Sequence, residues 1–325
     1  MNRKSLREET HNPKELLDMT NANYEAAVIR HTLEEMNADL EGPDGAGDIT
    51  TNAMFPERQQ AKGTIIAKQD GVIAGLEELE YFLAQIGQTF GQKLQGKISL
   101  KTFAKDGDSV KKGDEILEIS ADIHSLLAAE RTILNLLTHM SGIATYTRKI
   151  VDSVARHDVL VTATRKTLWG LLDKKAVTLG GGGTHRLNLA DAILIKDTHL
   201  DPINRDFEKA FAQIAATNPA CRFIEIEVLS KAEAIEACRA FIRSKIKGTC
   251  TIMFDNMQPD EISAALKELK AQNLYDNFLF EASGNITEKN ITSYAETGVD
   301  ILSLGCLTSQ APSFDASLKI DQTQI

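Results

Sequence analysis

The chain has 325 residues, a formal net charge of −10 at pH 7 and a pI near 5.3. This acidic balance argues against nucleic acid as a partner, because binding phosphates along a backbone calls for a basic face. Contents of 42% hydrophobic and 25% charged residues are those of a globular protein with one large domain or two ordinary ones.

Targeting and cysteine signals are weak throughout the chain. The N-terminus is charged and lacks the apolar core of a signal peptide, and no apolar run approaches the roughly 20 residues of a membrane span. The four cysteines are far apart, which argues against a disulfide framework or a zinc knuckle. We therefore expect a cytoplasmic protein.

The first third of the chain changes from helical to β texture. Residues 1–22 are polar and are predicted to be an extension with little structure of its own. Apolar positions in 23–40 follow a helical stripe, and residues 42–51 form a glycine-rich loop. Residues 62–119 alternate as strands, with a hairpin expected at Asp70-Gly71 and one helix inside the segment, between Leu76 and Gly87.

Two features of the next segments have simple structural interpretations. The stretch DGDSVKKGDEI (106–116) is similar to the strand turns of lipoyl-type carrier domains, but it lacks an attachment lysine in an exposed hairpin, so a carrier role is the least supported hypothesis. Residues 128–156 are strongly helical, and Ser141-Gly142 is predicted to kink or break that helix.

From Val159 onward, strand-like and helix-like segments alternate. Strand starts are 23 to 33 residues apart, the length of a βα unit, so the sheet should be parallel. A doubly wound sheet would concentrate its site in two or three loops, whereas an α/β barrel builds its site from all strand ends. Polar residues end all six predicted strands, which favours the barrel. The strands are 159–164, 192–197, 223–229, 250–255, 277–283 and 300–305.

The segment from Arg165 to His199 is locally positive, with six Lys or Arg against three Asp. Arg offers a bidentate fork for carboxylate or phosphate, and Lys a mobile point charge. We therefore expect a pocket for a small, multiply anionic ligand. The glycine run 180–183 would let the backbone approach that ligand. The cationic set is Arg165, Lys166, His185, Arg186 and Lys196.

Acidic and small residues complete the predicted site. Glu227 and Asp255 suit Mg²⁺, although structural carboxylates would fit the pattern equally well. Side chains alternate along a strand, so Glu225 and Glu227 should point the same way, toward the barrel mouth. Ser283, Gly284 and Gly305 at the last two strand ends suggest a phosphate cradle. Trp169 is either a substrate wall or, more commonly, a packing residue.

With these residues placed, the sequence resembles the quinolinate phosphoribosyltransferases, also called carboxylating nicotinate-nucleotide pyrophosphorylases. The resemblance implies an N-terminal α/β sandwich domain (23–136), a C-terminal incomplete α/β barrel (137–309), a tail (310–325) that returns to the first domain, and a homodimer or an assembly of dimers. It rests on GDIT (47–50), AERTILNLLTHMSGIAT (129–145), TRKT (164–167), GGG with THR (180–186), LIKD (194–197), EIEV (225–228), IMFDNM (252–257), EASG (281–284), GVDILSLG (298–305) and DASLKI (315–320).

The resemblance also implies a role for each predicted site residue. The two carboxylates of quinolinate would meet Arg165, His185 and Arg186, together with Arg131 contributed across the dimer interface. Lys166 and Lys196 would hold a carboxylate or the diphosphate of phosphoribosyl pyrophosphate. Glu227 and Asp255 would meet the ribose hydroxyls and Mg²⁺, and Ser283, Gly284 and Gly305 the 5′-phosphate. The sequence departs from the family at Trp169, Asn285 and Ser309, among others.

The activity so implied is Mg²⁺-dependent transfer of phosphoribose to quinolinate with decarboxylation, giving nicotinate mononucleotide, diphosphate and CO₂ for NAD biosynthesis. One alternative is a paralogue with another acceptor, of the type associated with molybdate transport. Another is a Schiff-base aldolase that uses Lys196. The charged neighbours of Lys196 suit diphosphate better.

Overall fold

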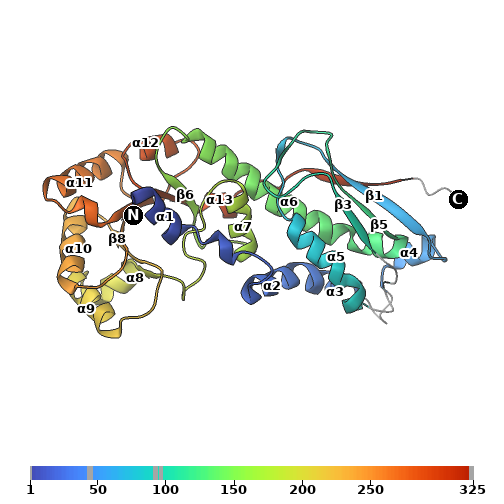
Figure 1. The fold of residues 1–325 in the computed structure, drawn as a ribbon, viewed down its shortest axis with the longest axis horizontal. Helices are drawn as coiled ribbons and strands as arrows, with labels where there is room; N and C mark the ends of the chain where they lie inside the picture. Colours follow the sequence, from blue (N-terminus) through green and yellow to red (C-terminus); the bar gives the residue numbers. More distant parts are fainter. Residues whose placement is uncertain (1, 42–46, 91–93, 95–97, 322–325) are drawn as a thin grey trace. The chain divides into compact units, whose positions relative to one another are not determined.

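The computed structural model describes residues 2–41, 47–90, 94 and 98–321. The chain forms two compact units (Figure 1). The barrel unit comprises Met1–Lys14, Lys149–Thr167 and Gly182–Ser309; the sandwich unit comprises Glu15–Arg148, Leu168–Gly181 and Gln310–Ile325. The first 14 residues thus group with the barrel strands, and 168–181 with the sandwich. The boundaries expected at 22, 136 and 309 stay predictions.

Six parallel strands make the sheet of the barrel unit, in the order β6-β11-β10-β9-β8-β7. Chain neighbours are therefore sheet neighbours except β6 and β7, the two edge strands, so the barrel is incomplete. The strands are short and almost wholly buried, as expected where helices cover a parallel sheet. They are β6 Leu160–Ala163, β7 Ile193–Ile195, β8 Ile224–Val228, β9 Cys250–Asp255, β10 Leu279–Ser283 and β11 Ile301–Leu304.

Helices connect these strands and cover the outside of the sheet. Their starts follow local rules: Asp206 and Ser230 accept backbone N–H groups as N-caps, and Pro259 opens a helix in the first turn. The helices are α8 Asp197–Leu200, α9 Phe207–Thr217, α10 Lys231–Ser244, α11 Pro259–Ala271, α12 Ile291–Ala295 and α13 Cys306–Ser309. This confirms the predicted α/β barrel architecture.

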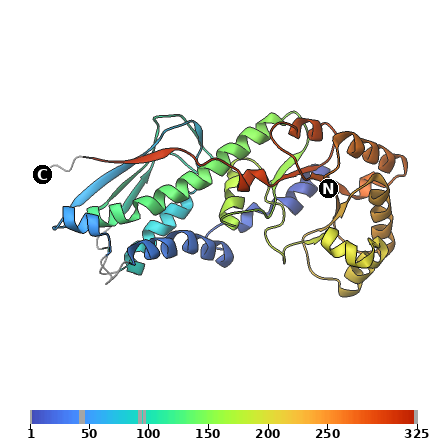
Figure 2. The same ribbon diagram turned by 180° about the vertical axis from the view of Figure 1, so that it is seen from behind.

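The N-terminal extension forms a helix, α1 Arg3–His11, so the expectation of little structure there is wrong. Its Leu6 packs against Leu160, Leu279 and Ile301, the first residues of β6, β10 and β11. The helix therefore lies at the amino ends of the strands (Figure 2).

Charged residues of α1 have distant acidic partners in the barrel. Arg3 donates from Nε to Asp300 Oδ1 at 2.8 Å, and Arg7 donates from Nη1 to the Asp158 carbonyl at 2.8 Å. A local reading of the sequence treats such residues as solvated, because their partners are more than 150 residues away.

The sandwich unit holds a four-stranded antiparallel sheet in the order β12-β1-β5-β3. The tail strand β12 Ala316–Ile320 pairs with β1 Gln60–Ala67. The other strands are β3 Ser99–Thr102 and β5 Glu115–Asp122, and a small separate sheet pairs β2 Gly71–Val72 with β4 Ser109–Val110. The helices are α2 Ala22–Ile29, a π-helical turn Arg30–Glu34, α3 Glu35–Leu40, α4 Ile49–Met54, α5 Leu76–Phe90, α6 Ile123–Ser153 and α7 Leu171–Leu179.

In the sandwich unit a predicted hairpin is wrong, and the helix predicted to kink or break at Ser141-Gly142 is not broken there. The hairpin at Asp70-Gly71 does not form, since β1 pairs with β5 and β12 whereas β2 pairs with β4. Helix α6 also continues through Ser141 and Gly142. A Cβ on Gly142 would lie 2.3 Å from the Pro312 carbonyl oxygen, so the glycine lets the tail pass closely over the helix. Of the predicted loop, 42–46 lie outside the described residues and Ile49 begins α4.

No helix in the described part of the chain has both the length and the apolar character needed to cross a membrane.

Candidate active site

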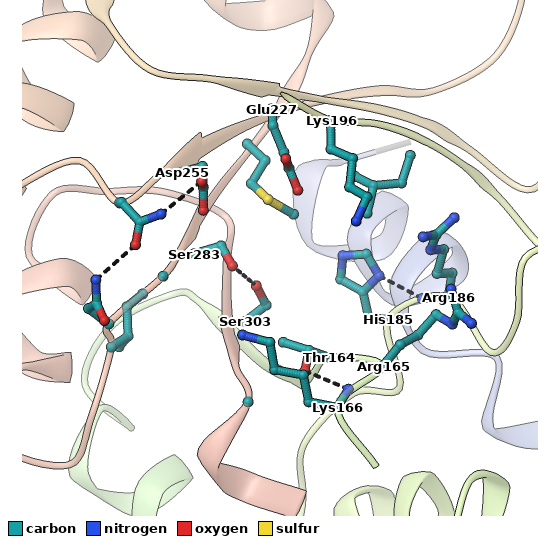
Figure 3. Close-up of a pocket in the computed structure, with 17 residues that line it drawn as sticks. Thr164, Arg165, Lys166, His185, Arg186, Lys196, Glu227, Asp255, Ser283 and Ser303 are labelled. Carbon is teal, nitrogen blue, oxygen red and sulfur yellow. Dashed lines mark hydrogen bonds between the residues drawn. The ribbon is translucent and has the colours of Figure 1, made fainter. Parts of the chain in front are cut away.

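A cavity of about 490 Å³ opens at the carboxyl ends of the barrel strands (Figure 3). The predicted cationic set, the two carboxylates Glu227 and Asp255, and the cradle residues Ser283, Gly284 and Gly305 all line it, whereas Arg131 does not. Arg131 is an exposed residue of α6 in the sandwich unit. The lining is Thr164, Arg165, Lys166, His185, Arg186, Leu194, Lys196, Glu227, Met253, Asp255, Asn256, Ser283, Gly284, Asn285, Ile286, Ser303 and Gly305.

Two arginines give the cavity a positive wall. Burial and the neighbouring charge of Arg165 lower the pKa of Arg186, so two guanidinium groups lie close together. The guanidinium of Arg186 is held in place by the protein, since its Nη1 donates to the Ala192 carbonyl at 3.2 Å. Such a pair of cations is relieved by an anion with more than one oxygen.

The loop after β6 is held by hydroxyl groups. Lys166 N donates to Thr164 Oγ1 at 3.1 Å, and Thr308 Oγ1 donates to the Lys166 carbonyl at 2.7 Å. Gly305 adjoins this lysine, since a Cβ there would lie 3.1 Å from Lys166 Cδ. Backbone bonds thus place Lys166 at the cavity while its ammonium group stays available.

The acidic side of the cavity carries surplus negative charge. Burial, and then the charge of Asp255, raise the pKa of Glu227 to about 7. Burial also raises the pKa of Asp255, and Asp197 adds to this. Close carboxylates that disfavour one another's ionisation form a donor set that a hard divalent cation would relieve. The oxygen ligands present therefore fit Mg²⁺.

The cradle at the last strand ends depends on backbone shape. Gly284 has φ +87°, and a Cβ there would lie 2.3 Å from Asn256 Oδ1, so only glycine fits. Asn285 has φ +55° and donates from Nδ2 to the same Asn256 oxygen at 2.9 Å. Asparagine tolerates the left-handed region better than other non-glycine residues, so the departure from the family at this position keeps the backbone conformation.

The sequence interpretation missed Asn256 as a site residue. It has φ +56°, donates to Asp255 Oδ2 at 2.8 Å and accepts from Asn285. An asparagine directly after a strand's terminal aspartate was the available signal. Ser309, the other departure near the cradle, donates to the Gly305 carbonyl at 2.9 Å and is not among the lining residues.

His185 is held by protein groups on both ring nitrogens. Arg186 N donates to Nδ1 at 2.7 Å, so the ring proton resides on Nε2. This Nε2 lies 3.0 Å from Glu225 Oε2 and 3.2 Å from Glu281 Oε2. Direct hydrogen bonding of the imidazole to a substrate would require one of these contacts to break.

Glu225 does not reach the barrel mouth, contrary to expectation. It points to the same side of β8 as Glu227 but lies two residues deeper, fully buried beside Glu281. Burial and the charge of Glu281 raise the pKa of Glu225 to about 8. Alternation along a strand predicts the side of a residue, but not its depth in the barrel.

The glycine run and Trp169 pack against protein rather than line the cavity. A Cβ on Gly180 would lie 2.5 Å from the Ala144 carbonyl oxygen. A Cβ on Gly183 would lie 3.1 Å from the His11 carbonyl oxygen. The expected role of this run in approaching a ligand is therefore wrong. Trp169 stacks on His31 with ring centroids 4.7 Å apart, in agreement with packing.

Comparison with known proteins gives matches over most of the chain. Residues 48–141 match the family described as quinolinate phosphoribosyl transferase, N-terminal domain, and residues 143–319 match its C-terminal domain. A probable carboxylating nicotinate-nucleotide pyrophosphorylase of Methanocaldococcus jannaschii is 38% identical, with 90% of this chain and 99% of the relative covered. A decarboxylating quinolinate phosphoribosyltransferase of Nicotiana glauca is 34% identical over 90% of this chain and 81% of its own length.

Solved structures agree with this result. The nicotinate-nucleotide pyrophosphorylase of Francisella tularensis superposes with a TM-score of 0.76 at 28% identity, covering 91% of this chain and 96% of the other. Sequence and fold thus match along both units, and the chain belongs to the quinolinate phosphoribosyltransferase family.

Proposed function

We propose that the protein transfers the phosphoribosyl group of phosphoribosyl pyrophosphate to quinolinate and releases diphosphate, CO₂ and nicotinate mononucleotide. The observation that carries this is the composition of the barrel-mouth cavity. Figure 3 places Arg165 and Arg186 on one side of it and Asp255 and Ser283 toward the other. A dicarboxylate and a phosphorylated sugar need these opposite surroundings at the same time.

The residues divide by the charge that they meet. Arg165 and Arg186 bind the carboxylates of quinolinate, and the His185 ring forms part of the cavity wall beside them. Lys166 and Lys196 neutralise a carboxylate or the diphosphate. Ser283, Gly284 and Gly305 surround the 5′-phosphate, which suits a strand-to-helix turn with free backbone N–H groups.

Glu227 and Asp255 bind the ribose hydroxyls and hold Mg²⁺. The ion supplies charge neutralisation for the leaving diphosphate. The two carboxylates also place negative charge near the anomeric carbon, where positive charge develops as the C–O bond to diphosphate breaks.

The reaction needs no protein nucleophile. The pyridine nitrogen donates its lone pair to the anomeric carbon as diphosphate leaves with the electrons of the broken bond. The pyridinium ring then accepts the electron pair of the bond to the 2-carboxylate, CO₂ departs, and a proton takes its place on the ring. The protein contributes positioning and charge, which account for much of the barrier reduction in such transfers.

The assembly is a homodimer in which Arg131 of the partner subunit completes the dicarboxylate site. Its exposed position on α6 in the sandwich unit supports this, because the barrel cavity does not contain it. We also propose that the enzyme acts in the cytoplasm.

Calorimetric titration with quinolinate and with nicotinate tests the function. We expect quinolinate to bind at least tenfold more tightly, because a second carboxylate adds a charge-assisted contact of roughly 1.5–3 kcal/mol. Arg186→Ala should weaken quinolinate binding by about 100-fold. The control Arg243→Ala removes an exposed ion pair with Glu208 between α9 and α10 and should change nothing.

Product analysis separates the rival activities. CO₂ released from quinolinate with phosphoribosyl pyrophosphate supports the proposal, and equal affinity for nicotinate and quinolinate would contradict it. Turnover of another acceptor alone would indicate the paralogous activity. A borohydride-trapped adduct on Lys196 would indicate an aldolase.

A further inference from the structure

Residues 1–47 precede both family matches, yet helix α1 within them reaches the interior of the barrel. Its last residue, His11, is fully buried. The His11 ring stacks on Phe223 with centroids 4.0 Å apart and meets the His185 ring edge-on at 5.1 Å. The N-terminal helix thus contacts a residue of the cavity wall.

The backbone of His11 also holds the segment that carries His185. Its carbonyl oxygen accepts a hydrogen bond from His185 N at 2.8 Å, and Thr184 Oγ1 lies 3.3 Å from it. His185 has φ +54°, an unfavourable conformation for a residue with a side chain. Such a conformation persists only where neighbouring contacts fix it.

The polar atoms of His11 are arranged toward the same cluster. Thr10 Oγ1 donates to the Leu6 carbonyl and lies 2.8 Å from His11 Nδ1, so Nδ1 carries the ring proton and Nε2 a lone pair. Within the part of the chain that the structure describes, this buried Nε2 has no hydrogen-bond partner. It belongs to a group with His185, Glu225 and Glu281 whose ligand atoms all lie within 4.8 Å of one another.

A metal ion would be one occupant of such a group, but the hydrogen bonds disfavour it. A histidine that binds a metal through one nitrogen normally donates from the other. His185 Nδ1 instead accepts from Arg186 N, so its Nε2 bears a proton and lies within ion-pair distance of both glutamates. The cluster has the arrangement of a clamp on the His185 ring, which the His11 ring meets edge-on and whose Nε2 lies beside two carboxylates.

We infer that His11 is a positioning residue for quinolinate: it fixes His185 and, through it, the adjacent Arg186 that faces the dicarboxylate. This inference rests on the proposed function. It assigns an active-site role to an N-terminal helix that neither family match includes. Because the clamp acts on the arginine side of the cavity, its loss should affect quinolinate and spare the phosphoribosyl substrate.

Steady-state kinetics of His11→Ala and His11→Phe test the inference. We expect His11→Ala to raise KM for quinolinate by about tenfold or more, since small displacements in a site are costly, and to leave KM for phosphoribosyl pyrophosphate within about twofold. His11→Phe keeps a ring against Phe223 and His185 and should recover most of the loss. Arg3→Gln is the control on the same helix, and it should lower Tm without altering either KM.

Three kinetic results would overturn the inference: an unchanged KM for quinolinate in His11→Ala, an equal rise of both KM values, or a His11→Phe variant as impaired as His11→Ala. One equivalent of metal in the wild-type protein that is lost in His11→Ala would also overturn it. If the wild-type protein does not use quinolinate, the proposed function fails separately. Crystal structures of the wild type and His11→Ala then decide the positioning role, which requires His185 and Arg186 to move.

Discussion

At the scale of single residues, the active site combines side chains whose charges oppose one another without cancelling. The charge of Asp255 disfavours the ionisation of Glu227, and that of Asp197 disfavours the ionisation of Asp255, whereas Arg165 and Arg186 form a crowded pair of cations. Their arrangement is suited to substrates and a metal ion that supply the missing charges.

The raised pKa of Glu227 predicts a pH-dependent stability. Below about pH 4.5 the carboxyl is protonated in the folded and unfolded chains, and above about 7 it is ionised in both. Between these values only the unfolded chain is ionised, so this group lowers stability as pH rises. We therefore expect the Tm of chelator-treated Glu227→Gln to fall less than that of the chelator-treated wild type between pH 5 and pH 7.5.

Mg²⁺ supplies the second half of this test. It should raise the Tm of the wild type more at pH 8 than at pH 5, because it binds the ionised carboxylates, and Glu227→Gln should respond weakly at both. Parallel pH curves for the two proteins would contradict the assignment of the raised pKa.

Eight of the ten predicted site residues in the cavity were recognisable because they stand at strand ends, where parallel βα units bring side chains together, whereas His185 and Arg186 lie in the segment before β7. The pattern failed where depth or conformation decided the role. Glu225 differs from Glu227 by one alternation along β8 and is buried in the interior. Asn256 and Asn285 both adopt left-handed backbone conformations, which asparagine tolerates but which cannot be predicted from the residue type alone.

At the scale of elements, two glycines within helices have opposite surroundings, one open to solvent and one packed against the tail. Gly87 in α5 is exposed, with no atom within 4 Å of an added Cβ. Gly142 in α6 is buried, and a Cβ would lie 2.3 Å from the Pro312 carbonyl and 2.9 Å from Phe314 N. The sequence predicts a helix end at Gly87 and a kink or break at Gly142, but α5 continues to Phe90 and α6 runs through Gly142, where the tail crosses it.

This contrast gives a matched pair of variants. Gly87→Ala should raise the free energy of unfolding by about 0.5–1 kcal/mol, the difference in helix propensity. Gly142→Ala should lower it by about 1–3 kcal/mol, because the tail backbone must move away from the new methyl group. Urea denaturation measures both. A stabilising Gly142→Ala would show that the tail does not pass so close to α6.

Helix α1 shows why an element can be invisible in a sequence. Its residues are mostly charged, and its burial depends on Asp158 and Asp300 at strand starts that follow more than 150 residues later. Local periodicity has no access to such partners. The strands, by contrast, are short segments rich in apolar and β-branched residues, which can be recognised without distant information.

At the scale of the whole molecule, the barrel unit contains the cavity and the sandwich unit contains Arg131. If each site takes Arg131 from the partner subunit, two inactive variants should complement one another. Mixed dimers of Arg131→Ala with Arg186→Ala would hold one intact site of two.

Refolding an equal mixture of these variants is the measurement. With random pairing, half of the dimers are mixed, so activity should recover to about a quarter of the wild-type value. Each variant refolded alone provides the baseline. Activity that stays at this baseline in a demonstrably mixed population would contradict a shared site.

The sequence by itself determined the parallel barrel, its strand ends and the chemical character of the cavity, since apolar runs and the polar residues after them are local properties. Only the tertiary structure decided the depth of Glu225, the partners of His185, the packing role of the glycine run and the place of α1. These depend on contacts between residues far apart in the chain, where two carboxylates and two histidines meet inside one barrel. The residues that give the site its charges can be recognised from the local sequence, whereas the contacts that orient them cannot.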